Sequence, residues 1–365
     1  MNPPYRCWAE IDLQALDHNL GELKKRVPAG VEFAAVIKAD AYGHGLQSIA
    51  TALAPKVEFL AVANLAEGLE IRKAGVQTQI IILGPAAPEE QPFIAQEGFI
   101  PTVSTAEEAR AYANCAAGQP LPIHFVIDTG MGRIGLWNSE AAVEFRKLAR
   151  LTQIRVTAIS SHLPVADEDL GYTAEQLERF KSEARQLSGT TPVTILNSAG
   201  VLRFGNVAQP GDIVRTGLAL YGISPLPDLQ PWLRPLLALK TRVVLVRNLA
   251  AGRSISYGRT FITDRETKVA TLAVGYGDGY QRHLSGAGTE VLIQGRRCPL
   301  LGRVTMDQIM VDVSDLPEVT AGEEAVLIGK QGNEEILASE LARKAGTIAW
   351  EIFTGITKRV VRVYR

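Results

Sequence analysis

The chain of 365 residues contains little cysteine and no long apolar run, and each shortage excludes a class of protein. Its three cysteines, Cys7, Cys115 and Cys298, are far apart and odd in number, so neither a disulfide framework nor a C-x-x-C zinc cluster is expected. They fit a reducing compartment. No stretch reaches the roughly 18 apolar residues of a membrane-spanning helix. Charges and prolines near the N-terminus leave no apolar core for a signal peptide, so a cytoplasmic location is expected.

An excess of charge of one sign is also missing. The chain has 38 Lys and Arg against 39 Asp and Glu, a formal net charge of −1. This balance gives no reason to expect nucleic acid or an anionic membrane as the partner. Hydrophobic residues make up 46% and charged residues 21%, which is typical of a globular protein with a large core. At about 150 residues per domain, the length suggests two or three domains.

Short apolar runs alternate with amphipathic stretches between about residues 30 and 225. The runs are rich in β-branched residues and too short for helices, so we interpret them as buried strands. There are eight, at 33–38, 59–64, 79–84, 99–104, 123–128, 156–162, 193–198 and 213–222. The stretches between them resemble helices, as at 65–75, 104–118 and 174–187. Eight strand–helix units predict a (β/α)₈ TIM-type barrel, with a doubly wound open sheet as the alternative.

The pattern changes after a proline-rich linker at about 223–236. Beyond it lie strand-like segments separated by glycine-containing turns, and one late helix at 336–346. We therefore predict an α/β protein with a barrel over residues 1–236 and a mainly β domain over 237–365. The strand-like residues 5–13 precede the barrel pattern, and residues 1–13 are a candidate to pair with the β domain.

Lys38 is the first candidate for chemistry. It follows five apolar residues at the expected carboxyl end of a strand, which in a barrel is the catalytic face. Desolvation lowers the pKa of a lysine, and a neutral amine can form a Schiff base with an aldehyde. A lysine that simply points to solvent is the alternative.

Other groups at strand ends suit an anionic ligand. Arg133 lies in a glycine-dense loop and could hold a carboxylate by two hydrogen bonds, although a surface arginine on a turn looks the same in sequence. His162 ends another strand, where a lone histidine is more often a buried structural residue than a catalytic one. Ser198 ends the seventh apolar run and Arg215 lies in the eighth, next to Gly217, and barrels commonly bind phosphate with the loops after these two strands. Together these groups could hold an aldehyde cofactor that bears a phosphate.

Eight segments of the chain, in the same order, resemble the alanine racemase family of pyridoxal-phosphate enzymes. They are AVIKADAYGHG (35–45), DTGMGRIG (128–135), SSHLP (160–164), NSAG (197–200), RTGLALYG (215–222), SISYGRTF (254–261), VGYGDGY (274–280) and TMDQIMVD (305–312). The resemblance implies a barrel plus a β domain, and a homodimer with shared active sites. It implies interconversion of L- and D-alanine, which supplies D-alanine for peptidoglycan.

The resemblance also implies roles for individual residues. Lys38 would bind pyridoxal 5′-phosphate covalently and act as one acid/base, and Tyr257 from the partner subunit would act as the other. The phosphate would be held by Tyr42, Ser198 and the backbone of Gly217 and Leu218. Arg215 would face the pyridine nitrogen with His162 behind it. The substrate would meet Arg133, the Met306 backbone, Asp307 and Tyr276. No metal is implied.

Two departures from the family pattern stand out. Some members carry a lysine that supports the loop arginine at the position of Val126, so Arg133 needs other support here. Many members have Tyr-Glu near the C-terminus where this chain has Trp350 and Glu351. An indole lacks the hydroxyl of tyrosine, and its bulk could change the choice of amino acid.

Three alternatives to an alanine racemase remain open. A racemase of broader specificity is one. A decarboxylase of the same plan is another, but such enzymes usually place an acid at the pyridine nitrogen, where this chain has Arg215. A pyridoxal-phosphate carrier of the single-barrel kind is the third, but such carriers lack the β domain.

Overall fold

Eight parallel strands form the N-terminal half of the computed structural model, which describes residues 5–116 and 118–365. They are β2 (Glu32–Val36), β3 (Phe59–Val62), β4 (Gln79–Ile82), β5 (Ile100–Val103), β6 (Leu121–Val126), β7 (Ile154–Ser160), β8 (Val193–Thr194) and β9 (Ile213–Thr216). β9 pairs with β2, and the Arg215 N–H donates to Leu196 O at 2.9 Å just after β8. The eight strands therefore close into a barrel, as predicted, and the alternative prediction of a doubly wound open sheet is wrong.

Helices cover the outside of this barrel, which explains why its strands are apolar on both faces. Thr105 begins one of them with a capping box, since its side chain accepts from the Glu108 N–H and Glu108 accepts from the Thr105 N–H. The covering helices are α3 (Leu46–Leu53), α4 (Leu65–Lys73), α5 (Gln91–Gln96), α6 (Ala106–Cys115), α7 (Asn138–Leu148), α8 (Leu170–Leu187) and α9 (Ser198–Phe204). Among the described residues, no helix is both long and apolar enough to cross a membrane.

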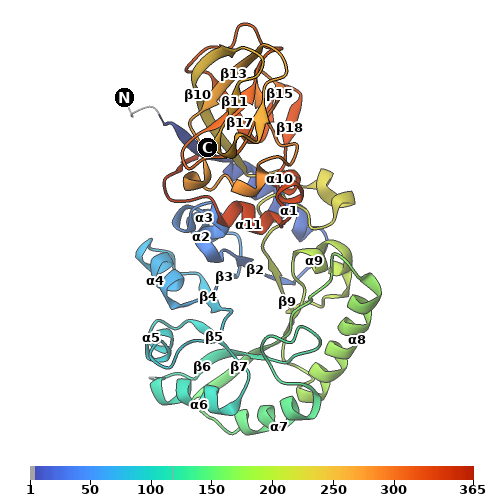
Figure 1. Cartoon of the computed structure of the whole chain (residues 1–365). Helices are drawn as coiled ribbons and strands as arrows, with labels where there is room; N and C mark the ends of the chain where they lie inside the picture. Colours follow the sequence, from blue (N-terminus) through green and yellow to red (C-terminus); the bar gives the residue numbers. More distant parts are fainter. Residues whose placement is uncertain (1–4, 117) are drawn as a thin grey trace.

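A nine-stranded, mostly antiparallel sheet forms the second half of the molecule, at the top of Figure 1. Its first member comes from the N-terminus: β1 (Cys7–Ile11) lies between β10 (Leu237–Leu249) and β19 (Val361–Tyr364). α1 (Leu13–Lys24) then leads into the barrel. The other strands are β13 (Thr267–Leu272), β14 (Glu290–Ile293), β15 (Arg296–Pro299), β16 (Ile309–Asp312), β17 (Glu324–Gln331) and β18 (Glu334–Ile336).

The segment 254–261, one of the strand-like segments expected after the linker, is mostly not a strand. β11 covers only Ser254–Ile255 and pairs with β12 (Phe261–Ile262). Between them Ser256 and Gly258 have φ of 64° and 73°, so the chain leaves the extended conformation. Tyr257 consequently lies on a short 3₁₀ turn with 70% of its surface exposed.

Two helices of the C-terminal half connect the sheet to the barrel. α10 (Ala338–Ala345) and α11 (Ala349–Thr354) lie between the sheet and the barrel in Figure 1. α11 packs beside α2 (Lys38–Gly43), the turn that follows the first barrel strand. Two hydrogen bonds reinforce this contact, from Arg362 Nε to Gly43 O at 3.0 Å and from the Tyr364 hydroxyl to His44 O at 3.1 Å. The C-terminal half therefore reaches the mouth of the barrel.

Candidate active site

A cavity of about 770 Å³ lies at the carboxyl ends of the barrel strands. This is the end at which barrel enzymes place their catalytic groups. Eight of the residues predicted to act in catalysis or binding line it: Lys38, Tyr42, Arg133, His162, Ser198, Arg215, Gly217 and Leu218. Val126 and Trp350, the two departures from the family pattern, line it as well.

Lys38 stands two residues beyond β2 and is largely buried in this cavity. Burial lowers the pKa of its ammonium, and the charges of Arg133 and Arg215 lower it further. The carboxylate of Glu67 acts in the opposite direction. The amine is therefore easier to deprotonate than a surface lysine, as nucleophilic or general-base chemistry requires.

The turn after Lys38 is left-handed. Ala39, Asp40, Ala41 and Tyr42 have φ between 51° and 55°, a region that costs L-residues roughly 1–2 kcal/mol each. Several hydrogen bonds stabilise this conformation. Glu67 accepts from the Ala39 N–H at 2.7 Å and, with its other oxygen, from the Ala63 N–H at 2.8 Å.

Asp40 and His44 hold the other end of the turn. Asp40 accepts from the Gly45 N–H through its backbone oxygen at 2.9 Å and from the Leu46 N–H through its carboxylate at 2.7 Å. His44 Nδ1 lies 2.8 Å from Tyr42 O. The turn is thus fixed at both ends, and it directs Tyr42 into the cavity beside Lys38.

Arg215 is a buried cation with neutral partners. Its terminal nitrogens donate to Thr194 O at 2.8 Å, to Thr194 Oγ1 at 2.7 Å and to Ser161 O at 2.6 Å. No carboxylate forms an ion pair with it in the described part of the chain. Burial lowers its pKa to about 10, which still leaves it charged near neutral pH. These contacts use the terminal nitrogens, and Nε has no hydrogen-bond partner in the part of the chain that the structure describes.

His162 is held neutral beside Arg215. Its Nδ1 lies 3.2 Å from an Arg215 nitrogen. Because a guanidinium can only donate, Nδ1 accepts and the imidazole proton is on Nε2. Burial and then the charge of Arg215 lower the pKa of His162 to about 3. His162 therefore orients Arg215 and does not act as a cation near neutral pH.

The end of the cavity near β8 and β9 has the form of an anion cup. Ser198 Oγ accepts from the N–H of Gly217 at 3.0 Å and of Ala219 at 3.3 Å, so its own proton is left to donate. Gly217 is close to the opposite wall: a Cβ there would lie 2.5 Å from the Tyr42 hydroxyl oxygen. The Leu218 N–H has no hydrogen-bond partner among residues 5–116 and 118–365. These donors converge on one small region and suit a phosphate.

Trp350 joins this cup from the C-terminal half. Burial raises the pKa of Tyr42 to about 12, and the nearby Trp350 indole acts in the opposite direction. Tyr42 is consequently a neutral donor. Because an indole N–H can only donate, Trp350 can engage only the phenol oxygen of Tyr42 and leaves its O–H for another acceptor.

The glycine-dense loop after β6 places Arg133 at the rim of the cavity. Asp128 shapes this loop, since its carboxylate accepts from the backbone N–H of Gly130, Met131 and Gly132 at 2.8–2.9 Å. Val126 contributes only an apolar side chain to the wall. Arg133 thus owes its position to the loop backbone, which Asp128 organises.

Four predicted site residues lie outside the cavity. Tyr257, Tyr276 and Met306 are exposed by 70%, 41% and 52%, and Asp307 lies beside Met306 on the same loop. All four belong to the C-terminal half, and none lines the cavity of their own chain. One chain therefore brings together the residues expected to hold a cofactor but not those expected to complete the substrate site.

Sequence reasoning missed several residues that organise the cavity. Glu67 anchors the Lys38 turn from α4, and Thr194 holds Arg215 from β8. In the sequence analysis, Asp128 appears only as the first residue of the DTGMGRIG motif (128–135), with no role given to it. Glu67 and Thr194 carry no local signal, since each acts on a residue more than 20 positions away.

The fold and the cavity define a barrel enzyme with an amine, a buried guanidinium and an anion cup on one face. Comparison with known proteins identifies its family. The family model described as alanine racemase, N-terminal domain, matches residues 11–225, and the model described as alanine racemase, C-terminal domain, matches residues 236–364. The alanine racemase of Halothermothrix orenii is 42% identical, over 98% of this chain and 96% of the relative.

Solved structures agree with these matches. The alanine racemase of Bacillus anthracis, determined with bound L-Ala-P, is 35% identical with a TM-score of 0.90, over 100% of this chain and 96% of that one. The biosynthetic alanine racemase of Pseudomonas aeruginosa is 33% identical with a TM-score of 0.90, over 99% of this chain and 100% of that one. The chain belongs to the alanine racemase family, a family of pyridoxal-phosphate-dependent racemases.

Proposed function

We propose that this protein interconverts L- and D-alanine with pyridoxal 5′-phosphate as cofactor. The observation that carries the proposal is the convergence of Lys38, Arg215 and the Ser198–Gly217 cup in one cavity. The D-alanine product would supply peptidoglycan synthesis, as the resemblance to the family implies. The cytoplasmic location stays a prediction.

The residues of the cavity fit the proposed cofactor. Lys38 would hold its aldehyde carbon, and Tyr42, Ser198 and the backbone of Gly217 and Leu218 would hold its phosphate. The unpartnered Leu218 N–H and the close approach of Gly217 to Tyr42 support this assignment. Arg215 would donate to the pyridine nitrogen. When bound, the cofactor supplies an electron sink for the carbanion formed at the substrate α-carbon.

Racemisation needs a proton removed from one face of the substrate and returned to the other. Lys38 Nζ serves one face, and its lowered pKa makes it an effective base nearer neutral pH. Tyr257 Oη serves the other face. Because Tyr257 is 70% exposed and absent from its own cavity, we assign it to the cavity of a second copy of this chain.

Substrate recognition follows the same division. Arg133, at the rim of the cavity, would bind the substrate carboxylate by charge-assisted hydrogen bonds. The Met306 backbone, Asp307 and Tyr276 would come from the partner's β domain. The protein would therefore be a homodimer with two shared sites.

Arg215 supports a racemase over a decarboxylase. A guanidinium does not give up its proton readily, so it leaves the pyridine nitrogen unprotonated and limits how much negative charge the ring accepts. This restricts the reaction to proton transfer at the α-carbon. A racemase of broader specificity is the second candidate, because Trp350 lines the cavity where many relatives carry tyrosine.

The direct test is to load the purified protein with cofactor, record its visible spectrum, and follow the chirality of alanine, serine and several larger amino acids. We expect a yellow protein that racemises alanine best. Lys38→Ala is the matched variant, and it should lose both the lysine-bound absorbance and the racemisation. A wild-type protein that takes up no cofactor and leaves every enantiomer unchanged would refute the proposal.

A further inference from the structure

Two loops of the β domain carry the proposed substrate contacts, and they are joined along their backbones. The Tyr276 N–H donates to Thr305 O at 3.0 Å, and the Gly277 N–H donates to Met306 O at 2.9 Å. Gly275 makes the approach possible, since a Cβ there would lie 2.2 Å from Thr305 O. The two loops are therefore fixed to each other at Tyr276 and Met306.

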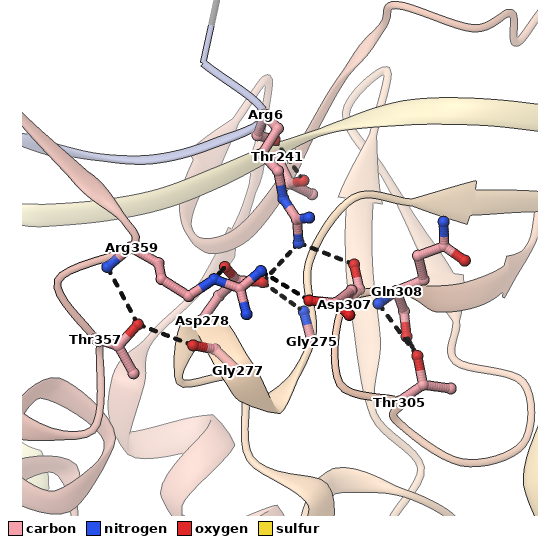
Figure 2. Close-up of polar contacts among 10 residues, drawn as sticks. All are labelled: Arg6, Thr241, Gly275, Gly277, Asp278, Thr305, Asp307, Gln308, Thr357 and Arg359. Atoms are coloured by element: carbon pink, nitrogen blue, oxygen red, sulfur yellow. Dashed lines mark hydrogen bonds and ion pairs between the residues drawn. The ribbon is translucent and has the colours of Figure 1, made fainter.

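Asp278, a buried carboxylate, follows Tyr276 on the first loop and contacts Gly275 (Figure 2). The Asp278 side chain is only 3% exposed, although it lies two residues from the exposed Tyr276. One oxygen, Oδ2, accepts from the Gly275 N–H at 3.0 Å. A buried carboxylate needs further compensation for its charge, because leaving it unpaired costs several kcal/mol.

Two arginines from opposite ends of the chain supply that compensation. Arg6 Nη2 lies 2.9 Å from Asp278 Oδ2, and Arg359 Nε lies 3.3 Å from Asp278 Oδ1. Both arginines extend to the second loop: Arg6 Nη2 donates to Asp307 O at 3.0 Å, and Arg359 Nη2 to Asp307 Oδ1 at 2.7 Å. Each guanidinium thus ties Asp278 on one loop to Asp307 on the other, as Figure 2 shows.

Thr357 fastens the arrangement to the segment that carries Arg359. Its N–H donates to Asp278 O at 3.1 Å and its hydroxyl to Gly277 O at 2.9 Å. Arg362 in turn donates to Thr357 O at 2.7 Å. The two loops are therefore fixed to β19 and to the segment just before it, independently of the cavity in the same chain.

We propose that Arg359 and Arg6 are positioning residues for the substrate carboxylate, which hold the Met306–Asp307 backbone and Tyr276 in place at the mouth of the partner's cavity. The inference rests on the proposed function. Neither arginine lines the cavity, so both act through Asp278 and Asp307. Hydrogen-bond donors must lie within a few tenths of an ångström of their acceptor, so a displaced Met306 backbone weakens substrate binding.

The test compares Arg359→Met with Arg359→Lys in the cofactor-loaded enzyme. We expect Arg359→Met to raise KM for alanine about tenfold with kcat changed less than about threefold, because the acid/base pair is untouched. Arg359→Lys should fall between Arg359→Met and wild type, since one ammonium cannot span both carboxylates as the guanidinium does. Unchanged KM in a folded Arg359→Met dimer would overturn the proposal.

Two further readouts separate positioning from general damage. Propionate, a carboxylate of substrate size, should inhibit Arg359→Met about tenfold less strongly, while the visible absorbance and affinity of the cofactor stay at wild-type values. Equal losses of cofactor affinity and propionate affinity would contradict the proposal. If Arg359→Met fails to fold, Arg6→Gln takes its place, with a rise in KM of about threefold or more expected and no rise contradicting the proposal.

A pair of tagged heterodimers locates the defect. When Lys38→Ala pairs with Arg359→Met, the only functional barrel is in the Arg359→Met chain and meets an intact loop, so KM should be normal. When the double variant Lys38→Ala/Arg359→Met pairs with wild type, the functional barrel meets the altered loop, so KM should be high. The same KM in both pairs would overturn the proposal, whereas an inactive wild type would instead refute the proposed function.

Discussion

At the scale of single residues, Lys38 shows how the surroundings set chemistry. Burial and two nearby guanidiniums lower its pKa, and Glu67 alone among the named causes raises it. The sequence predicted a lysine against an apolar wall. It could not predict Glu67, which reaches the turn from α4 and also holds its backbone.

Glu67→Gln should therefore lower the pKa of Lys38 further, because the opposing negative charge is removed. In apoprotein, the rate of pyridoxal phosphate capture by Lys38 should begin to rise at lower pH than in wild type. The matched control is Glu70→Gln, on the same helix, which should leave the profile unchanged. A profile that does not move, or moves to higher pH, would contradict this account of Lys38.

Trp350 is a second residue whose effect depends on one contact. Trp350→Phe removes the indole N–H, which can donate to the Tyr42 hydroxyl in the cavity that both residues line, while keeping an aromatic ring. Cofactor affinity should fall about fivefold, on the order of 1 kcal/mol for one hydrogen bond. Titration of apoprotein with pyridoxal phosphate measures it, with Trp232→Phe, on an exposed turn, as control. Equal affinity in Trp350→Phe and wild type would remove Trp350 from phosphate binding.

Arg215 should limit side reactions. Arg215→Glu places a carboxylate beside the pyridine nitrogen of the bound cofactor. A carboxylate can accept a hydrogen bond from that nitrogen and so stabilise its protonated form. We expect racemisation to fall at least tenfold, about 1.4 kcal/mol in the barrier. We also expect up to one pyruvate per cofactor, because the amino group of alanine would pass to the cofactor aldehyde and convert it to the amine. Chirality and pyruvate assays on Arg215→Glu and Arg215→Lys measure both effects. Unchanged racemisation without pyruvate would contradict the proposed selectivity.

At the scale of elements, regular segments were predictable and irregular ones were not. The eight apolar runs predicted the eight strands, because helices cover the outer face of the barrel and the strands' own side chains fill its interior, so neither face needs polar residues. The left-handed turn over 39–42 had no such signal. It contains no glycine, and side chains from α4 and near the C-terminus hold it in place.

Tyr257 illustrates the same limit. The segment 254–261 was expected to be a strand, but Ser256 and Gly258 adopt positive φ and expose the Tyr257 ring on a turn. The SISYGRTF motif therefore singled out Tyr257 without predicting the turn on which it lies.

His44 gives the turn a dependence on pH. It is fully buried among Tyr42, Tyr221 and Phe353, and its Nε2 has no partner in the described structure. Burial lowers its pKa to about 4 from 6.5. Between these values the unfolded chain binds more protons than the folded one, so the free energy of unfolding falls as the pH drops.

His44→Asn should flatten this dependence, by up to about 1.4 kcal/mol per pH unit between pH 6.5 and 4. Denaturant unfolding at several pH values measures the slope. The exposed His283 is the control position, and His283→Asn should retain the wild-type slope. A wild-type slope in His44→Asn would show that His44 does not titrate as described.

At the scale of the whole molecule, the residues of the proposed site are divided between the two halves of the chain. The barrel holds the cavity, and the β domain carries Tyr257, Tyr276 and Met306 outside it. The (β/α)₈ barrel and the mainly β domain were predictable from the change of pattern after the proline-rich linker. The division at residue 236 stays a prediction, and β1 shows that the N-terminus pairs within the C-terminal sheet.

Long-range clusters were beyond prediction for a physical reason. Arg6, Asp278, Asp307 and Arg359 meet only because β1 and β19 lie side by side in that sheet. No local pattern encodes such a meeting. The family resemblance supplied the site residues, and the structure supplies the contacts that hold them.

The central claim is that two copies of the chain build each site. Mixing inactive Lys38→Ala and Tyr257→Phe proteins under conditions that exchange subunits tests it most directly. Half of the dimers should then be hybrids, each with one site that has both Lys38 and Tyr257, so racemisation should recover to about a quarter of the wild-type activity. An activity that stays at the level of the separate variants, although hybrids are shown to form, would contradict the claim.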